Sequence, residues 1–66
     1  MDSKAIGQRL RNLRGGKSLQ EVSEDIGISQ SALCMYECGE RIPRDEIKVK
    51  LASYYETSVQ ALFFAE

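Results

Sequence analysis

Few residues of this chain could carry out covalent chemistry. Its 66 residues include no His and two Cys, at positions 34 and 38. Without His, nucleophilic catalysis of the Ser-His or Cys-His kind has no base, and two Cys leave a structural zinc site short of its usual four ligands. We therefore expect neither an enzyme nor a metal or cofactor site, and we interpret the chain as a binding module.

The two cysteines are four positions apart, so on a helix Cys34 and Cys38 would share one face. They cannot link distant elements, and reduced thiols are expected. A redox or thiophilic-metal sensor is the alternative, because a cross-link would strain the helix that carries them. Unchanged binding after mild peroxide, with oxidation followed by mass spectrometry, would discard this alternative.

The charges are unevenly distributed although the net charge is only −1. Residues 3–20 carry five basic side chains and no acidic one, residues 21–40 carry five acidic and no basic ones, and residues 41–50 carry four basic and two acidic ones. An acidic middle therefore lies between two basic segments. Within that middle, the segment 28–40, ISQSALCMYECGE, contains no Lys or Arg.

The length predicts a single domain over residues 1–66 with a small core and no large ligand cavity, since a chain of this size buries only about 60% of its unfolded surface. No run of 18 apolar residues is present, which argues against a transmembrane helix and any membrane association. We expect a cytoplasmic protein, and no small-molecule substrate is evident.

Apolar spacing and helix-end residues predict five short helices and no strand. Ile6, Leu10 and Leu13 form the stripe of a first helix that ends at Gly15-Gly16. Ser18 and Glu21 form a capping box that opens a second helix, which ends at Gly27. The inner face of this second helix is supplied by Val22 and Ile26.

The remaining helices follow from similar signals. Ser29 caps a third helix that Gly39 terminates, with Leu33 and Tyr36 inward. Pro43, in the loop 41–44, suits the first position of a fourth helix. Ser58 caps the last. Inward positions of the last two helices are Ile47, Leu51, Ala52, Tyr55, Val59, Leu62 and Phe63.

A tight glycine-containing turn between the second and third helices defines a helix-turn-helix. The positions that must pack or turn are occupied by Val22, Ser23, Ile26, Gly27, Ile28, Leu33 and Tyr36. Here the chain resembles the Cro/phage-repressor (Xre-like) helix-turn-helix family over roughly residues 6–63. IGQRLRNLR resembles its first helix, SLQEVSEDIGISQSALCMYECGE its helix-turn-helix, and RIPRDEIKVKLASYYETSVQALFF its closing helices. The resemblance implies a lambda-repressor-like five-helix bundle that binds operator DNA as a dimer.

Three features depart from the family pattern. The link GGK before Ser18 is about two residues shorter than usual. Leu19 stands where the family commonly has a Gln that contacts the DNA backbone, although backbone N–H groups there remain available to a phosphate. Glu56 replaces the glycine that commonly ends the fourth helix, so we expect a strained left-handed residue at this position.

The resemblance places base-reading side chains at the start and outward face of the third helix, which here are Gln30, Ser31, Cys34 and Met35. Gln can bind adenine bidentately, Ser can contact several base edges, and apolar groups can contact a thymine methyl group. Contacts to the DNA backbone are expected from Lys17, Ser29, Arg41 and Arg44, with Arg9 as a further candidate. Base reading and phosphate attraction are separate tasks, so the uncharged helix needs no cations of its own.

Two further roles follow from the resemblance. Glu37 matches a family glutamate that pairs with an arginine at the end of the first helix, here Arg14, so we expect a structural ion pair. Phe64 cannot easily face the core together with Phe63, and we expect it to contribute to a homodimer. The predicted function is sequence-specific transcriptional regulation, as a repressor on a palindromic operator of double-stranded DNA. The alternative is a protein-interaction module of the same fold, an antitoxin-like or antirepressor partner that binds through the acidic middle.

Overall fold

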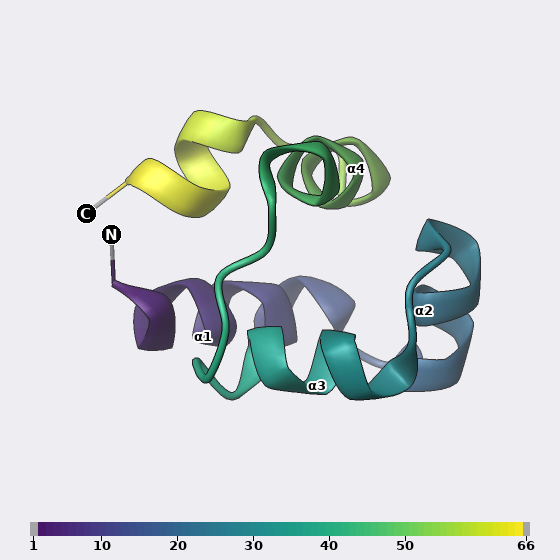
Figure 1. Cartoon of the computed structure of the whole chain (residues 1–66). Coiled ribbons are helices and arrows are strands. Elements are labelled where there is room, and N and C mark those ends of the chain that lie inside the picture. Colours follow the sequence, from purple (N-terminus) through teal and green to yellow (C-terminus); the bar gives the residue numbers. More distant parts are fainter. Residues whose placement is uncertain (1, 66) are drawn as a thin grey trace.

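The computed structural model describes residues 2–65, which form five helices and, within that range, no strand. The helices are α1 (Ser3–Arg14), α2 (Leu19–Ile26), α3 (Gln30–Glu37), α4 (Asp45–Tyr54) and a short π-helical segment, η1 (Gln60–Phe64). In Figure 1, α1 and α3 lie side by side, α2 stands at one end of this pair, and α4 and η1 lie across from it. The predicted all-α class is confirmed. No helix in this range is long and apolar enough to cross a membrane.

One small hydrophobic core joins all five helices. Its members are Ile6, Leu10, Val22, Ile26, Leu33, Tyr36, Leu51, Ala52, Leu62 and Phe63. Each had been expected on an inner face. Ile28, Ile47, Tyr55 and Val59 are partly buried against this core. Apolar burial drives the packing of helices that would be too short to persist alone in water.

The prediction for the end of α1 is wrong at one position. Ile6 and Leu10 are buried as expected, but Leu13 is 41% exposed. The inward face continues at a spacing of four to Arg14, which is partly buried, so Leu13 falls beside this face. The sequence pattern allowed either spacing, and the ion pair of Arg14 described below determines which residue turns inward.

Serine hydroxyls cap three of the helices as predicted. Ser18 Oγ accepts from Glu21 N–H at 3.0 Å, Ser29 Oγ from Ala32 N–H at 3.0 Å, and Ser58 Oγ from Ala61 N–H at 2.9 Å. The reciprocal bond of the capping box, from Ser18 N–H to the Glu21 carboxylate, does not form within residues 2–65. Each cap satisfies one backbone N–H that the helix itself cannot pair.

The fourth helix begins two residues later than Pro43 predicts. Arg44 is its extended N-cap residue, with no side-chain cap bond, and α4 starts at Asp45. Pro43 instead lies buried in the loop. Asp45 and Glu46 then occupy the first turn, where negative charge interacts favourably with the helix dipole.

Glu56, which follows the end of α4, adopts the left-handed conformation that was expected there, with φ of 56°. Its N–H bonds Ser53 O at 3.1 Å, and the next N–H, of Thr57, bonds Ala52 O at 2.9 Å. These two bonds satisfy the last carbonyls of α4 and hold Glu56 in a conformation that a glycine would adopt without strain.

The closest approach between helices is that of α1 to α3. Gly7 lies in the interior of α1 and packs directly on the backbone at the end of α3. A Cβ atom at this position would lie 2.3 Å from Glu37 O and 2.8 Å from Tyr36 O. Only a residue without a side chain lets the two backbones come this close, and this contact fixes the position of α3 on the body of the protein.

Tyr55 buries its hydroxyl without any hydrogen-bond partner among residues 2–65. Burial raises the pKa of Tyr55 to about 12, compared with about 10 for a free tyrosine. The unfolded chain therefore loses this proton at a lower pH than the folded chain. This difference stabilises the fold fully below about pH 10 and is lost as the pH rises through 12.

We expect Tyr55→Phe to leave stability unchanged or to raise it by up to about 1 kcal/mol at pH 8, because it removes an unpaired buried hydroxyl. The advantage over the wild type should grow between pH 10 and pH 12. Urea unfolding at a series of pH values would measure it. Tyr54→Phe is the control, since Tyr54 donates to Asp25 Oδ2 at 2.7 Å and should lose stability at pH 8. A constant difference between Tyr55→Phe and wild type across this pH range would contradict the prediction.

Candidate nucleic-acid interface

The turn between α2 and α3 is short and is held by two backbone hydrogen bonds. Gly27 has a left-handed φ of 86°, and the N–H groups of Gly27 and Ile28 both bond Ser23 O, at 2.8 and 3.0 Å. Ser29 then caps α3. Ser23 is buried at the junction, where a larger side chain would push the two helices apart. The three residues 27–29 therefore set α3 at a fixed angle to α2.

The outward face of α3 carries the side chains expected to contact bases. Gln30, Ser31 and Cys34 are exposed, whereas Met35 is half-buried and so less available than expected. The opposite face holds Leu33, Tyr36 and Glu37 in the interior. Cys38, directly after the helix, is exposed as well. The exposed face, defined here as Gln30, Ser31, Cys34, Met35 and Cys38, carries hydrogen-bonding and sulfur groups and no formal charge at neutral pH.

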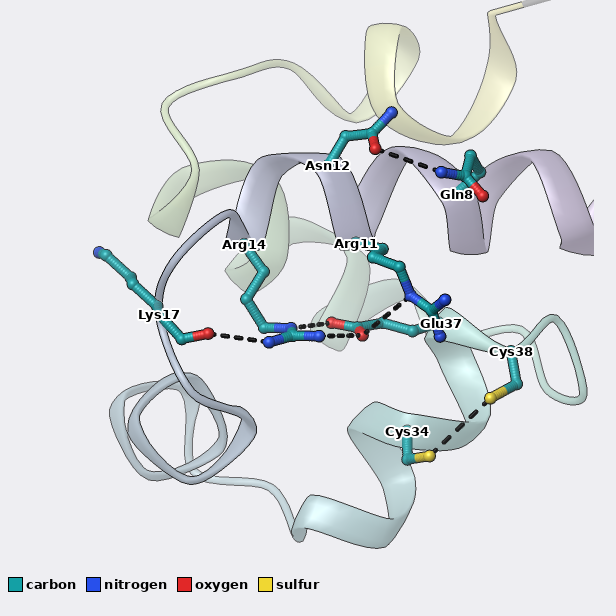
Figure 2. A network of polar contacts seen from close by, with 8 residues as sticks. All are labelled: Gln8, Arg11, Asn12, Arg14, Lys17, Cys34, Glu37 and Cys38. Carbon is teal, nitrogen blue, oxygen red and sulfur yellow. Dashed lines mark hydrogen bonds and ion pairs between the residues drawn. The ribbon is translucent and has the colours of Figure 1, made fainter.

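Glu37 is the only acidic residue of α3, and an ion pair removes it from the surface. Arg14 Nε donates to Glu37 Oε2 at 2.8 Å, and Arg14 Nη2 donates to Oε1 at 3.1 Å. The Glu37 side chain is only 2% exposed. The hydrogen bonds to Glu37 raise the pKa of Arg14 above its ordinary value. The bidentate geometry makes this a strong contact between α1 and α3 (Figure 2).

The same guanidinium also holds the link between α1 and α2. Arg14 Nη1 donates to Lys17 O at 2.8 Å. A second arginine, Arg11, lies with its Nε 4.0 Å from Glu37 Oε1, and its side chain is 56% exposed. Arg11 was not among the residues singled out in the sequence. Arg11 precedes Arg14 by three positions, so the two arginines are neighbours on the surface of α1. This spacing could have indicated that Arg11 lies near Glu37, but it is not specific.

Arg41 and Arg44 are exposed and lie in the segment between α3 and α4. They line a surface hollow together with Ile28, Tyr36, Ile42, Glu46 and Ile47. Neither arginine forms an ion pair within residues 2–65. Ile28 lies just before α3 and Tyr36 lies in its last turn, so this hollow holds both arginines beside that helix.

Lys17 is held by an aromatic partner that the sequence did not indicate. Its Nζ lies 3.3 Å from Tyr54 Oη and 4.7 Å from the centre of that ring. The hydrogen bond to Tyr54 raises the pKa of Lys17, so the ammonium stays charged. Tyr54 in turn bonds Asp25 (see above). In Figure 2 the Lys17 side chain points away from Cys34 and Cys38. Its distance from Tyr54 along the chain explains why no local pattern predicted the contact.

Arg9 is not free to contact DNA as expected. Its Nη1 donates to Leu62 O at 3.0 Å and its Nη2 donates to Ala65 O at 2.6 Å. The guanidinium therefore fastens the end of η1 onto α1. The sequence shows a basic residue on the first helix but not the carbonyl groups that the fold brings to it.

Phe64 and Phe63 face different environments, as expected. Phe63 is 1% exposed and Phe64 is 48% exposed. Lys48 Nζ lies 5.9 Å from the centre of the Phe63 ring and 5.4 Å from that of Phe64, so a cation lies near both rings. Phe64 thus leaves an apolar surface on η1.

Two helices packed across a three-residue turn, with the second presenting an uncharged polar face, define a DNA-binding protein of the helix-turn-helix class. A family model described as helix-turn-helix matches residues 8–62, which is more than half of the chain. The chain belongs to this family, the Cro/C1-type (Xre-like) helix-turn-helix proteins, and the resemblance seen in the sequence is confirmed. No curated protein and no solved structure matches the chain significantly.

Proposed function

We propose that this protein is a sequence-specific transcriptional repressor that acts in the cytoplasm as a single domain. The exposed face of α3 enters the major groove, where Gln30 and Ser31 bond base edges and Cys34 and Met35 contact apolar groups such as thymine methyls. The observation that carries the proposal is the burial of Glu37. With this carboxylate inside the protein, the helix offers hydrogen-bonding groups to DNA and no repulsion to phosphates.

The phosphate contacts are assigned to groups around this helix. Arg41 and Arg44 line the hollow beside this helix and form no ion pair within residues 2–65, Ser29 keeps its hydroxyl proton available while it caps α3, and Lys17 stays charged beside Tyr54. Lys17 can reach a phosphate in two ways. Its ammonium either moves away from the Tyr54 ring, or it bonds the Tyr54 hydroxyl and the phosphate at the same time. Glu24 and Asp25 are acidic side chains of α2. Gln20 of the same helix donates a hydrogen bond to Glu24, and Tyr54 of α4 donates one to Asp25.

The operator is a palindrome read by a homodimer, with half-sites about one helical turn apart. Phe64 on η1 supplies the apolar contact between the two copies. Light scattering at high protein concentration tests this part. A protein that stays monomeric both free and on DNA would disprove it, although the assignment of α3 to the groove would stand.

The division of labour between bases and phosphates is tested by two substitutions. Gln30→Ala should relax discrimination at one base pair of each half-site, by about 1–3 kcal/mol. Arg44→Ala should weaken binding to all sequences and lower the slope of log affinity against log salt concentration by about 1 for each protomer. Gel shifts on DNA from upstream of the gene, followed by selection from random duplexes, would measure both effects.

Matched controls exist for both substitutions. Gln8→Ala removes an exposed glutamine of α1 whose side chain, among residues 2–65, bonds only Asn12. Lys50→Ala removes an exposed positive charge that lies beside Asp25, on the α2 and α4 side of the protein. Neither control should alter sequence preference, and Lys50→Ala should change the salt slope less than Arg44→Ala. If Gln30→Ala weakened all sequences evenly while Arg44→Ala changed the preferred sequence, the assignment of roles would be wrong. A wild-type protein that bound no duplex would favour a protein-interaction module of the same fold.

A further inference from the structure

The two cysteines form a pair of free thiols at the end of α3. The Sγ atoms of Cys34 and Cys38 are 3.8 Å apart, and both side chains are exposed. Figure 2 shows them pointing toward each other from successive turns. Within residues 2–65 no cluster of three or more His, Cys, Asp or Glu side chains could hold a metal ion. The site therefore offers two sulfur ligands and no third protein ligand.

This separation suits a bridging atom better than a disulfide. A disulfide needs the sulfurs about 2.05 Å apart, together with close Cβ atoms, and the helical backbone between residues 34 and 38 opposes that approach. A tetrahedral metal ion with bonds of about 2.3 Å to sulfur would hold two sulfurs about 3.8 Å apart, and a pyramidal arsenic(III) centre, whose angle at arsenic is narrower, would draw them somewhat closer. Such a centre fits between the thiols without unwinding α3.

The surroundings of the thiols also bear on chelation. The hydrogen bond with Cys34 raises the pKa of Cys38, so this thiol is protonated at neutral pH. A ligand must therefore displace protons from the pair. Two charged side chains act on this thiol in opposite directions: Glu40 raises the pKa of Cys38, and Arg11, which lies on the side of Cys38, lowers it (Figure 2). Chelation should accordingly tighten as the pH rises.

We propose that Cys34 and Cys38 form a bidentate dithiolate site for a soft, thiophilic ligand that needs two sulfurs. Two ligand classes share this chemistry: a trivalent arsenic compound with one organic substituent, and a soft metal cation. With an arsenic(III) oxide, two S–H bonds break, two As–S bonds form, and the oxygen leaves as water, with no change in oxidation state. With a divalent cation, two S–H bonds are replaced by two metal–sulfur bonds, and two protons pass to the solvent.

The position of this site gives ligand binding a consequence for DNA. Gln30, Cys34 and Cys38 follow one another at a spacing of four, so they lie along one stripe of α3. A ligand bridging the two sulfurs would stand on the surface assigned to the major groove. This step rests on the proposed function: occupation of the thiols would displace the protein from its operator.

The chelate itself is tested without DNA. Reduced protein is mixed with phenylarsine oxide in an excess of a monothiol and analysed by native mass spectrometry, and in a second arm Cd²⁺ is titrated by ultraviolet sulfur-to-metal charge transfer. The wild type should take up one phenylarsenic group per chain, and this uptake should tighten with pH. Cys34→Ser and Cys38→Ser should each bind at least about 100-fold more weakly, because the second bond of a chelate forms within one molecule. Circular dichroism verifies that both variants remain folded.

The outcomes separate the parts of the proposal. Equal binding by wild type and both serine variants, or no binding of either probe, would overturn the dithiolate site. Binding of one probe alone would assign the site to that ligand class. Gel shifts then compare loaded wild type with a Cys34→Ser/Cys38→Ser protein treated in the same way. Loss of DNA binding only in the wild type supports displacement, and equal shifts overturn it. A protein that never binds DNA contradicts the proposed function and leaves the chelation result valid.

Discussion

Gly7→Ala is expected to destabilise the protein by about 3 kcal/mol or more, enough to remove much of the stability of a chain this short. In an ordinary helix interior the same substitution would stabilise by about 1 kcal/mol. Here the new Cβ would stand 2.3 Å from Glu37 O and 2.8 Å from Glu37 C, both backbone atoms that cannot rotate away. The contact between α1 and α3 must therefore open.

Urea or thermal unfolding followed by circular dichroism would measure this loss. Gly16→Ala provides the matched control, because no heavy atom beyond its chain neighbours lies within 4 Å of its Cβ position and its φ is not in the left-handed region. That substitution should leave stability unchanged or raise it by about 0.4–1 kcal/mol. Similar losses for the two variants would mean that α1 and α3 do not pack as closely as described.

Arg14→Met is expected to cost about 3 kcal/mol, because it leaves the Glu37 carboxylate buried without its partner. The pair lies at the contact of α1 with α3, so its loss would also loosen the helix that carries Gln30 and Ser31. Arg11→Met tests charge alone, since Arg11 is exposed and reaches Glu37 only at 4.0 Å. It should cost about 0.5 kcal/mol or less.

A double substitution distinguishes the cost of an unpaired charge from the value of the pair. Arg14→Met combined with Glu37→Leu should recover most of the stability, since neither charge then remains in the interior. Chemical unfolding of the four proteins would give the coupling energy. If Glu37→Leu added to the loss caused by Arg14→Met, the ion pair would not be the source of the effect.

The helices could be predicted because their signals are local. A capping serine marks where α2 and α3 each begin, and a glycine marks where the chain turns after each of them. These signals locate the ends of both helices within a residue or two. Apolar spacing identified every member of the buried core. The error at Leu13 arose where two spacings of the same stripe were compatible with the sequence, and only the position of Glu37 distinguishes them.

The candidate site was less predictable because its contacts join distant parts of the chain. The resemblance to relatives supplied the pairing of Arg14 with Glu37, which no local rule indicates. Nothing near Arg9 shows that the carbonyls of Leu62 and Ala65 would bond it, and nothing near Lys17 points to Tyr54. Charged side chains are placed by the partners that the fold brings to them, and these partners follow from tertiary structure.

The absence of formal charge on the exposed side of α3 has a consequence for a cell whose internal ion concentration fluctuates. Ions in solution compete for the phosphates with Arg41, Arg44 and Lys17, whereas the hydrogen bonds from Gln30 and Ser31 to bases displace few counterions. A rise in osmolarity would therefore lower the affinity of the protein for all genomic sites by a common factor. The ranking of those sites would persist, and promoters would keep their order of response.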